Sequence, residues 1–212
     1  MKVGIIALGS HKERHGAALP PDTDAKIAEH IALETARKTD AEFLGTLKSS
    51  YELPEINTGD HQPIEEVIEE LKDKIQEVKA EGFEGLLIVN GHGGNQELEN
   101  HLEEVEKEMQ IKLRMDSTIC QIEGPHAGTG ELSIGSILGI TDESQIEEHQ
   151  NPEKHPEVGF AGFEKVREKY DWAEDHAQEV INEGVRIDES IGKDLLDSAI
   201  SNAAEKTREM GS

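Results

Sequence analysis

Short aliphatic runs alternate with longer stretches of helical periodicity along this chain, and this alternation limits its fold more than any other feature. Strands are expected at residues 3–8, 41–46 and 85–89, with a further strand within 111–122. Helices are expected at residues 24–38, 63–80, 96–109, near 133, at 156–170 and at 193–210. Strands separated by helices favour a parallel sheet with right-handed crossovers. We therefore predict an α/β fold of three layers, a mostly parallel sheet flanked by helices, within one domain spanning residues 1–212.

Two shorter features complete this outline of the chain. The polar segment 142–156 carries His149 and His155 and is expected to be an excursion on the surface. Cys120 follows Ile119 in an apolar run, where we expect a buried structural thiol within a strand. Because it is the only cysteine in the chain, an intramolecular disulfide framework is excluded, which is typical of a reducing cytoplasm.

The composition indicates an aliphatic core beneath a strongly acidic surface. Aromatic residues make up only 3% of the chain, so the core must be built mainly from Ile, Leu, Val and Ala. The 46 acidic and 21 basic residues give a formal net charge of −25, which repels phosphate backbones and argues against a nucleic-acid partner. No run approaches the ~18 apolar residues that a membrane span requires, so we expect a cytoplasmic protein without a membrane partner.

The richest group of chemically active side chains lies in residues 9–24, directly after the first expected strand. Open α/β sheets bind their ligands at this end of a strand. Glu13, His15, Asp22 and Asp24 lie here among glycines and prolines, a composition that can hold a divalent transition metal and suits a hydrophobic core poorly. For any one of these residues a polar surface turn is the simpler interpretation, whereas the group as a whole favours a metal site.

Two further loops follow expected strands and carry the same kinds of side chain. Residues 90–95 place His92 in a glycine-rich turn, before a helix whose first N–H groups favour anions. Residues 124–133 carry His126 and Glu131, five residues apart. A lone histidine is more often structural than a ligand, and Glu131 also suits the N-terminus of a helix because of the helix dipole. For each residue alone, both interpretations remain open.

The carboxyl ends of parallel strands share one edge of a sheet, so these three loops should converge. The candidate ligands at that edge are His11, Glu13, His15, Asp22, Asp24, His92, His126 and Glu131. Mixed imidazole and carboxylate ligands suit Zn²⁺, Fe²⁺ or Mn²⁺ and do not suit Ca²⁺ or Mg²⁺. Two such ions, bridged by a carboxylate, can polarise a carbonyl and activate water, which predicts a metal-dependent hydrolase.

Three motifs, in order along the chain, resemble those of the creatininase family. They are Glu13-Arg14-His15-Gly16 with Leu19-Pro20 and Asp24, then Asn90-Gly91-His92-Gly93-Gly94-Asn95, then His126-Ala127-Gly128-x-x-Glu131-x-Ser133. The resemblance runs from residue 3 to residue 136. It implies a divalent-metal amidohydrolase with two ions per subunit, Fe²⁺ first and Zn²⁺ or Mn²⁺ as alternatives. It also implies a homodimer or a larger homo-oligomer.

The resemblance implies four metal ligands: Glu13 on one ion, His15 on the other, Asp24 bridging both, and His92 completing the first site. One position departs from the family pattern. Creatininases place a metal-binding glutamate two residues after the histidine that matches His92, and here that position is Gly94. Either Glu131 fills the vacancy or the second site is weak and rich in water. The departure also argues against creatinine as the substrate.

Within the family, residues 9–24 are most similar to archaeal members that remove formate from a formylamino pyrimidine nucleotide, in the synthesis of riboflavin and coenzyme F420. The resemblance implies the same hydrolysis here, with this small molecule as the substrate. Protonated His126 would stabilise the developing oxyanion, and Glu131, unless it is a ligand, would carry a proton to the leaving amine. The alternatives are a different amide substrate within the family, or metal binding without catalysis.

The phosphate of such a substrate must be held despite the negative charge of the protein. The predicted substrate-binding residues are Asn90, Gly93 and Gly94, because backbone N–H groups of this loop can bind an anion. A cation such as Arg14 or Lys48 can assist. The only tryptophan of the chain lies outside the motif region, so the tryptophan positions of creatininases have no clear counterpart.

Overall fold

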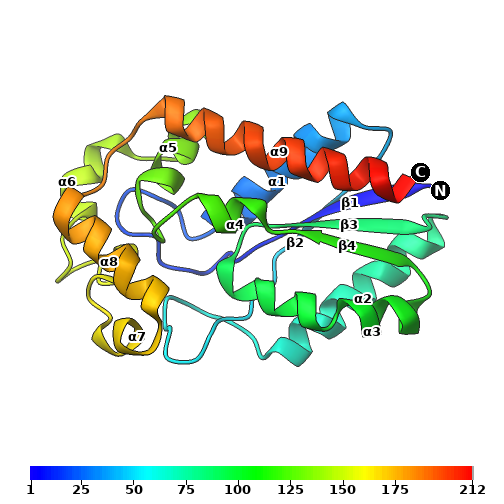
Figure 1. Cartoon of the computed structure of the whole chain (residues 1–212), viewed down its shortest axis with the longest axis horizontal. Helices are drawn as coiled ribbons and strands as arrows, with labels where there is room; N and C mark the ends of the chain where they lie inside the picture. The colour runs from blue at the N-terminus through cyan, green and yellow to red at the C-terminus, as the bar shows by residue number, and fades with distance from the viewer. Residues whose placement is uncertain (212) are drawn as a thin grey trace.

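A four-stranded sheet forms the centre of the computed structural model, which describes residues 1–211 (Figure 1). Its strands are β1 Val3–Leu8, β2 Glu42–Leu47, β3 Gly85–Asn90 and β4 Lys112–Asp116. They lie in the order β2-β1-β3-β4, and every neighbouring pair is parallel. The central strands β1 and β3 are buried at every residue, which explains why their sequences are aliphatic without alternation. The predicted parallel sheet is confirmed.

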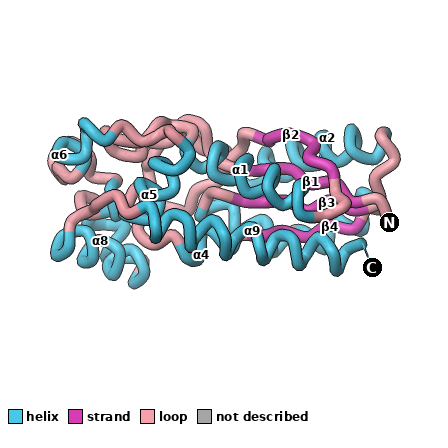
Figure 2. The backbone as a smooth tube through the Cα atoms, turned by 90° about the horizontal axis from the view of Figure 1, so that it is seen from above, coloured by secondary structure: helices cyan, strands magenta, loops and turns pink. Residues whose placement is uncertain are grey.

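Helices cover both faces of this sheet (Figure 2). The α-helices are α1 Thr23–Lys38, α2 Ile64–Ala80, α3 Leu102–Met109, α4 Thr118–Ile122, α5 Thr129–Leu138, α6 Ile146–His149, α7 Glu164–Lys169, α8 Asp171–Glu183 and α9 Glu189–Gly211. Short 3-10 helices are η1 Gly93–Asn100, η2 Glu143–Gln145 and η3 Val158–Phe160. On one face, Ile31 of α1 and Ile200 of α9 belong to one apolar cluster. On the other face, Leu71 of α2 and Val105 of α3 belong to a second. The three-layer prediction is therefore confirmed.

The long periodic helices and the strands lie close to where the sequence places them, and the glycine-rich stretches differ. The helix expected at residues 96–109 is divided into η1 and α3, since its start is rich in Gly and Asn. Gly159, with a φ of 57°, interrupts the helix expected at 156–170, so α7 covers only its last part. Helix α8 was not predicted. Cys120 lies in α4 and not in a strand, because β4 ends at Asp116, whose carboxylate accepts a hydrogen bond from the N–H of Thr118.

The segment 142–156 is not wholly a surface excursion, because His149 is fully buried. Its Nδ1 accepts a hydrogen bond from the N–H of Ala18 at 3.0 Å, and its Nε2 donates to the carbonyl of Ala127 at 2.8 Å. The ring therefore joins the loop after β1 to the loop before α5. The sequence around His149 is polar and gives no sign of this role, because both hydrogen-bond partners of the ring are backbone groups far away in the chain.

The carboxyl ends of all four strands point to the same end of the molecule, opposite the two termini (Figure 1). There α1 begins close against the strand ends because two glycines leave room for it. A Cβ atom on Gly9 would lie 2.6 Å from the backbone nitrogen of Ala25, and one on Gly91 would lie 2.4 Å from the carbonyl oxygen of Asp24. The absence of these side chains sets the position of Asp24. No helix in residues 1–211 is long and apolar enough to cross a membrane.

We expect Gly91→Ala to lower the free energy of unfolding by about 1–3 kcal/mol, the usual effect of forcing an atom into a closely packed site. Gly93→Ala is the matched control, because a Cβ atom there meets nothing within 4 Å. Urea unfolding of the two variants measures the difference. Equal stabilities would contradict the role of Gly91 in seating the first turn of α1.

Candidate metal centre

Five buried ionisable side chains come together at this edge of the sheet: Glu13, His15, Asp24, His92 and Glu131. Asp24, in the first turn of α1, lies between the two histidines. Its Oδ1 is 2.8 Å from Nε2 of His15, and its Oδ2 is 2.8 Å from Nδ1 of His92. Ser10 also donates its hydroxyl proton to Oδ2. Asp24 is thus placed to contact both halves of the cluster, as expected of a bridging ligand.

The two histidines are held in the same way, each by one ring nitrogen. Nε2 of His92 is 2.9 Å from the carbonyl oxygen of Tyr51, and Nδ1 of His15 is 3.2 Å from that of Glu13. A carbonyl only accepts, so these two nitrogens carry the protons. Without a metal the other ring nitrogen, 2.8 Å from a carboxylate oxygen of Asp24, must carry a proton as well, and a bound cation would take the place of that proton. Histidine ligands of metals usually donate one ring N–H to a carbonyl in this way, which fixes the orientation of the ring.

Two groups of converging ligand atoms share Asp24. In the first group, Nδ1 of His92 also lies 3.1 Å from Oε2 of Glu13. In the second group, Nε2 of His15 also lies 3.5 Å from Oε2 of Glu131. Each group therefore combines one imidazole nitrogen with oxygens from two carboxylates, which is a donor set for a divalent transition metal.

Unsatisfied oxygens test whether a cation fits these groups. Oε2 of Glu13 and Oε2 of Glu131 are buried, and neither has a hydrogen-bond partner within residues 1–211. A buried carboxylate oxygen without a donor is costly, and a bound cation removes that cost. Both oxygens belong to the groups around Asp24, so the residues fit a divalent metal. A metal at these two groups remains a prediction for this chain.

The pKa values of the cluster residues also indicate that positive charge stabilises the buried carboxylates. Although burial alone would lower the pKa of His15, the adjacent carboxylate of Asp24 raises it to about 10. Burial would raise the pKa of Glu13, but the neighbouring His92 holds it well below its usual range. Burial raises the pKa of Glu131 despite His15 nearby. In the absence of metal, protons on the imidazoles therefore compensate the buried carboxylates.

His126 lies beside the second group on the cavity side. Its Nε2 donates to the carbonyl oxygen of Arg14 at 2.8 Å, and its Nδ1 faces Oε1 of Glu131 at 3.9 Å. The N–H of Ala127 donates to the same Oε1 at 2.9 Å. Ala127 adopts a left-handed conformation, with a φ of 51°, which is strained for a residue with a side chain. The loop before α5 is thus folded so that both His126 and Glu131 face the cluster.

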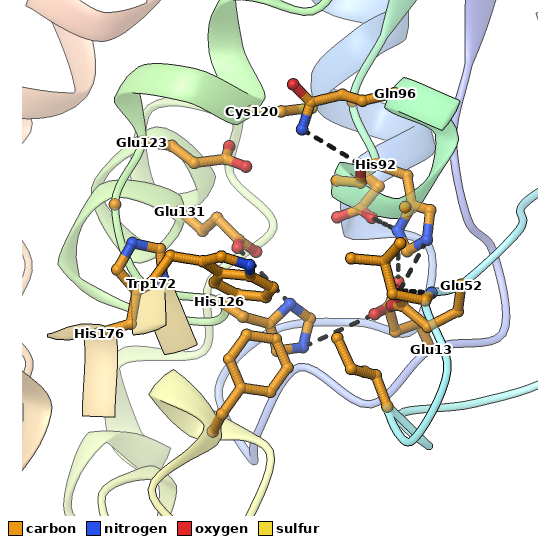
Figure 3. A pocket seen from close by; sticks show the side chains of 18 residues that line it. Glu13, Glu52, His92, Gln96, Cys120, Glu123, His126, Glu131, Trp172 and His176 are labelled. Carbon is orange, nitrogen blue, oxygen red and sulfur yellow. Dashed lines mark hydrogen bonds and ion pairs between the residues drawn. The ribbon is translucent and has the colours of Figure 1, made fainter. Parts of the chain in front are cut away.

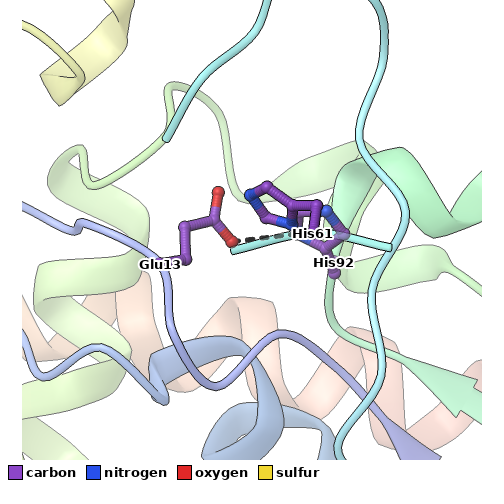
Figure 4. A group of neighbouring side chains, drawn as sticks. All are labelled: Glu13, His61 and His92. Atoms are coloured by element: carbon purple, nitrogen blue, oxygen red, sulfur yellow. Dashed lines mark ion pairs between the residues drawn. The ribbon is translucent and has the colours of Figure 1, made fainter. Parts of the chain in front are cut away.

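A chain of hydrogen bonds from the loop after β2 orients Glu13, and it was not predicted from the sequence. One member of this chain, His61, lies beside Glu13 and His92 in Figure 4. Thr58 donates its hydroxyl proton to Oε1 of Glu13 at 2.8 Å. Nε2 of His61, 3.0 Å from the same hydroxyl, must then be the donor, and Nδ1 of His61 accepts from the hydroxyl of Ser50 at 3.0 Å. Burial lowers the pKa of His61 to about 4, which keeps the ring neutral. His61 lies near enough to Glu13 and His92 to be a ligand, but its two nitrogens are already bonded.

The same loop explains why position 94 is a glycine. A Cβ atom on Gly94 would lie 2.1 Å from the carbonyl oxygen of Tyr51, so no side chain can start there. The loop brings a different carboxylate to this side of the cluster, because Oε2 of Glu52 lies 3.7 Å from Nε2 of His92. Burial raises the pKa of Glu52 to about 7. The glutamate expected two residues after His92 is therefore replaced by backbone of another loop.

A cavity of about 300 Å³ opens beside the cluster (Figure 3). The cluster residues lie along one side, and Phe160, Trp172 and His176 contribute an aromatic wall. Phe160 stacks on His126, with ring centroids 5.4 Å apart, and meets Trp172 edge-on at 5.5 Å. These aromatic residues were not predicted, because they come from η3 and α8, beyond the motif region.

Glu123 also lines this cavity, at the end of α4. Burial and the neighbouring Glu131 raise the pKa of Glu123 well above its usual range, and no hydrogen bond or ion pair to its carboxylate occurs within residues 1–211. The thiol of Cys120 lies nearby, and burial raises its pKa well above the usual range, which agrees with a structural role.

The other predicted residues differ in whether they reach this cavity. Asn90 is fully buried, and its amide binds the backbone of His92, so it positions this loop and does not line the cavity. Gly93 and Gly94 do line it. Lys48 is exposed away from it, and Arg14 lines a second cavity, of about 640 Å³, on the other side of the loop that carries Glu13. His11 does not line either cavity, and Asp22 pairs with Lys26 at 2.7 Å.

We expect Thr58→Val to weaken metal binding about 10- to 100-fold, because Oε1 of Glu13 loses its donor and the carboxylate is free to turn. Competition with a chelating dye for Zn²⁺ or Mn²⁺ measures the dissociation constant. Thr46→Val is the control, since its hydroxyl binds Glu29 far from the cluster. Unchanged affinity in Thr58→Val would show that this hydrogen bond does not orient Glu13.

Comparison with known proteins adds independent findings. A family profile described as creatinine amidohydrolase matches residues 1–207. A protein of Methanobrevibacter ruminantium, named 2-amino-5-formylamino-6-ribosylaminopyrimidin-4(3H)-one 5'-monophosphate deformylase, is 43% identical over 202 residues, 95% of this chain and 86% of the relative. A protein of the same name from Methanothermobacter thermautotrophicus is 41% identical over 211 residues, 99% of this chain and 89% of the relative.

Solved structures share the fold at lower sequence identity. A creatinine amidohydrolase (creatininase) superposes with a TM-score of 0.69 at 14% identity, covering 97% of this chain and 88% of that one. A structure described as "Creatininase Mn" gives a TM-score of 0.67 at 16% identity, covering 98% of this chain and 90% of that one. The sheet, its flanking helices and the edge that carries the cluster therefore belong to a known architecture.

Proposed function

This chain belongs to the creatininase family, and we propose that it hydrolyses the formamide of 2-amino-5-formylamino-6-ribosylaminopyrimidin-4(3H)-one 5'-monophosphate, releasing formate. The observation that carries the proposal is the identity of about 40%, over nearly the whole chain, to archaeal proteins named for this activity. The buried imidazole and carboxylate cluster supplies the chemistry that such an amidohydrolase needs. By the resemblance described above, the reaction belongs to riboflavin and coenzyme F420 synthesis.

The ligand groups support a centre of two divalent ions, with Asp24 shared between them. Glu13 and His92 would hold one ion, and His15 and Glu131 the other. Glu131 would then supply the carboxylate ligand that the family pattern assigns to the position of Gly94, which its unpartnered Oε2 near His15 favours. Fe²⁺ is the ion that the family resemblance favours, while the donor set also accepts Zn²⁺ and Mn²⁺. Metal analysis of protein purified without oxygen decides among them.

The reaction adds water to the formyl carbon and breaks the bond from that carbon to the amine nitrogen. A divalent metal held by these residues would polarise the formyl oxygen and lower the pKa of the attacking water. His126 borders both the cluster and the cavity, so its Nδ1, which faces Glu131, can carry a proton. Transfer of that proton to the amine nitrogen lets the aminopyrimidine leave as formate forms. His126 in its protonated form also stabilises negative charge on the formyl oxygen.

Formate release from the nucleotide by metal-loaded protein, handled without oxygen, tests the function directly. Formate and the diaminopyrimidine product are measured together, with creatinine as the control substrate. Hydrolysis of creatinine or of another amide, without formate release, would favour a different activity within the family. Metal binding without cleavage of any amide would favour a non-catalytic protein.

We expect Glu131→Gln to reduce kcat at least ~100-fold, within the range for general acid–base residues, and to lose one equivalent of bound metal. A neutral amide keeps the size of the side chain but cannot offer a charged ligand. Full metal content with slow turnover would make Glu131 a proton carrier instead. Near-normal turnover, with stability reduced by only ~0.3–1 kcal/mol, would leave it as a helix-dipole partner. Glu104→Gln on the exposed face of α3 is the control.

A homo-oligomer, at least a dimer, is the assembly we expect from the family resemblance. The chain has a mass of 23.4 kDa, so light scattering at working concentration should give a particle of about twice that mass or more. A particle of the mass of one chain would contradict this expectation.

A further inference from the structure

Glu123 is a carboxylate in the cavity for which residues 1–211 provide no donor. The other acidic groups that line the cavity are bonded within the protein: Asp24 to Ser10, Glu13 to Thr58, Glu52 to the N–H of Leu53, and Glu131 to the N–H of Ala127. Figure 3 shows Glu123 beside Glu131, directed into the cavity on the side away from Glu13. Its two oxygens are therefore free to accept hydrogen bonds from a bound molecule.

The backbone holds Glu123 firmly at this point. Its N–H donates to the carbonyl oxygen of Ile119 at 3.0 Å, at the end of α4. Gly130 lies so close that a Cβ atom there would be 1.9 Å from the carbonyl oxygen of Glu123. Gly124 then turns the chain with a φ of 83°. A carboxylate on such a fixed support is suited to recognition, because little conformational entropy is lost when it binds.

An aromatic surface lies in the same cavity. Trp172 is 39% exposed although its ring packs edge-on against the buried Phe160, so part of the indole remains free. A flat heterocycle can stack on an indole face, and such stacking holds bases without requiring a particular sequence. One wall of the cavity thus suits a planar ring, and Glu123 suits a group of N–H donors at the edge of that ring.

The chemistry of the substrate matches this pair. A 2-aminopyrimidin-4(3H)-one carries an N–H at position 3 beside the amino group at position 2, so two donors point in one direction. Burial and Glu131 disfavour the charged form of Glu123 in the empty cavity, and these two donors stabilise it. The ionised carboxylate then accepts both at once, in a charge-assisted bidentate pair. We infer that Glu123 binds the 2-amino and N3–H edge of the pyrimidinone ring while the ring stacks on Trp172. This inference rests on the proposed function and names the groups that select its substrate.

Glu52 is the other carboxylate that faces this cavity without belonging to the two ligand groups, and its surroundings differ. It already accepts the N–H of Leu53 at 2.7 Å and lies 3.7 Å from His92. The edge with the 2-amino group lies across the ring from the formylamino group at position 5. A carboxylate that binds this edge must be separate from the cluster that receives the formyl group, and Glu123 meets that requirement.

Two substrates and two variants test the inference. Wild-type protein and Glu123→Gln are compared on the nucleotide and on the analogue that lacks its 2-amino group. We expect wild type to lose about 10- to 100-fold in kcat/KM on the analogue, as for loss of one bidentate base contact. Glu123→Gln should raise KM for the nucleotide by a similar factor, with little change in kcat, and should no longer distinguish the two substrates. Glu104→Gln is again the control.

Equal discrimination between the two substrates by wild type and Glu123→Gln would overturn the inference. If wild type releases no formate from the nucleotide, the proposed function itself fails, and that result is seen before any variant is examined. If wild type is active but does not distinguish the analogue, only the role of Glu123 fails.

A second measurement does not depend on turnover. Trp172 is the only tryptophan of the chain, so its fluorescence reports stacking on it. We expect 2,6-diaminopyrimidin-4(3H)-one to quench it saturably in metal-loaded wild type and to bind at least tenfold more weakly to Glu123→Gln. The ring without the 2-amino group should bind wild type more weakly than the diamino ring does, and its affinity should differ less between wild type and Glu123→Gln. Absence of quenching in wild type would show that the ring does not stack on Trp172.

Discussion

The contact of Asp24 with two histidines is the interaction on which the rest of the site depends. Its two carboxylate oxygens meet His15 from the loop after β1 and His92 from the loop after β3. Each ring is bound to a backbone carbonyl through its other nitrogen, so neither can turn away. Close approach of Gly9 and Gly91 to the first turn of α1 makes this geometry possible. The fold thus supports three buried carboxylates in one place, which is stable only with cations or protons among them.

The parts of this structure that follow from local pattern could be predicted from the sequence. β1 and β3 are continuous aliphatic runs, and α2 has a clear helical period, so the parallel sheet and its layers could be foreseen. Glu13 and His15 could be singled out because a group of imidazole and carboxylate side chains directly after a strand is typical of a metal site. Asn90, in the same kind of loop, serves instead to hold the backbone of His92.

Contacts between distant segments could not be predicted, since no local pattern records them. Thr58 and His61 lie in a loop without a motif, and they matter because one hydroxyl of that loop reaches Glu13. Gly94 has a similar explanation, since the carbonyl of Tyr51 occupies the space beside it. The aromatic wall depends on α8, whose approach to the cavity is set by packing against η3. Such features arise from proximity in space between segments that are far apart in the chain.

Two glutamates close together in the chain illustrate how surroundings assign different roles to one residue type. Glu131 has one oxygen fixed by the N–H of Ala127 and the other directed at His15, so it is arranged to meet a cation. Glu123 has no donor from residues 1–211 and faces the open cavity, so it is arranged to meet N–H groups. Each carboxylate lacks what a ligand would supply, positive charge in one case and hydrogen-bond donors in the other.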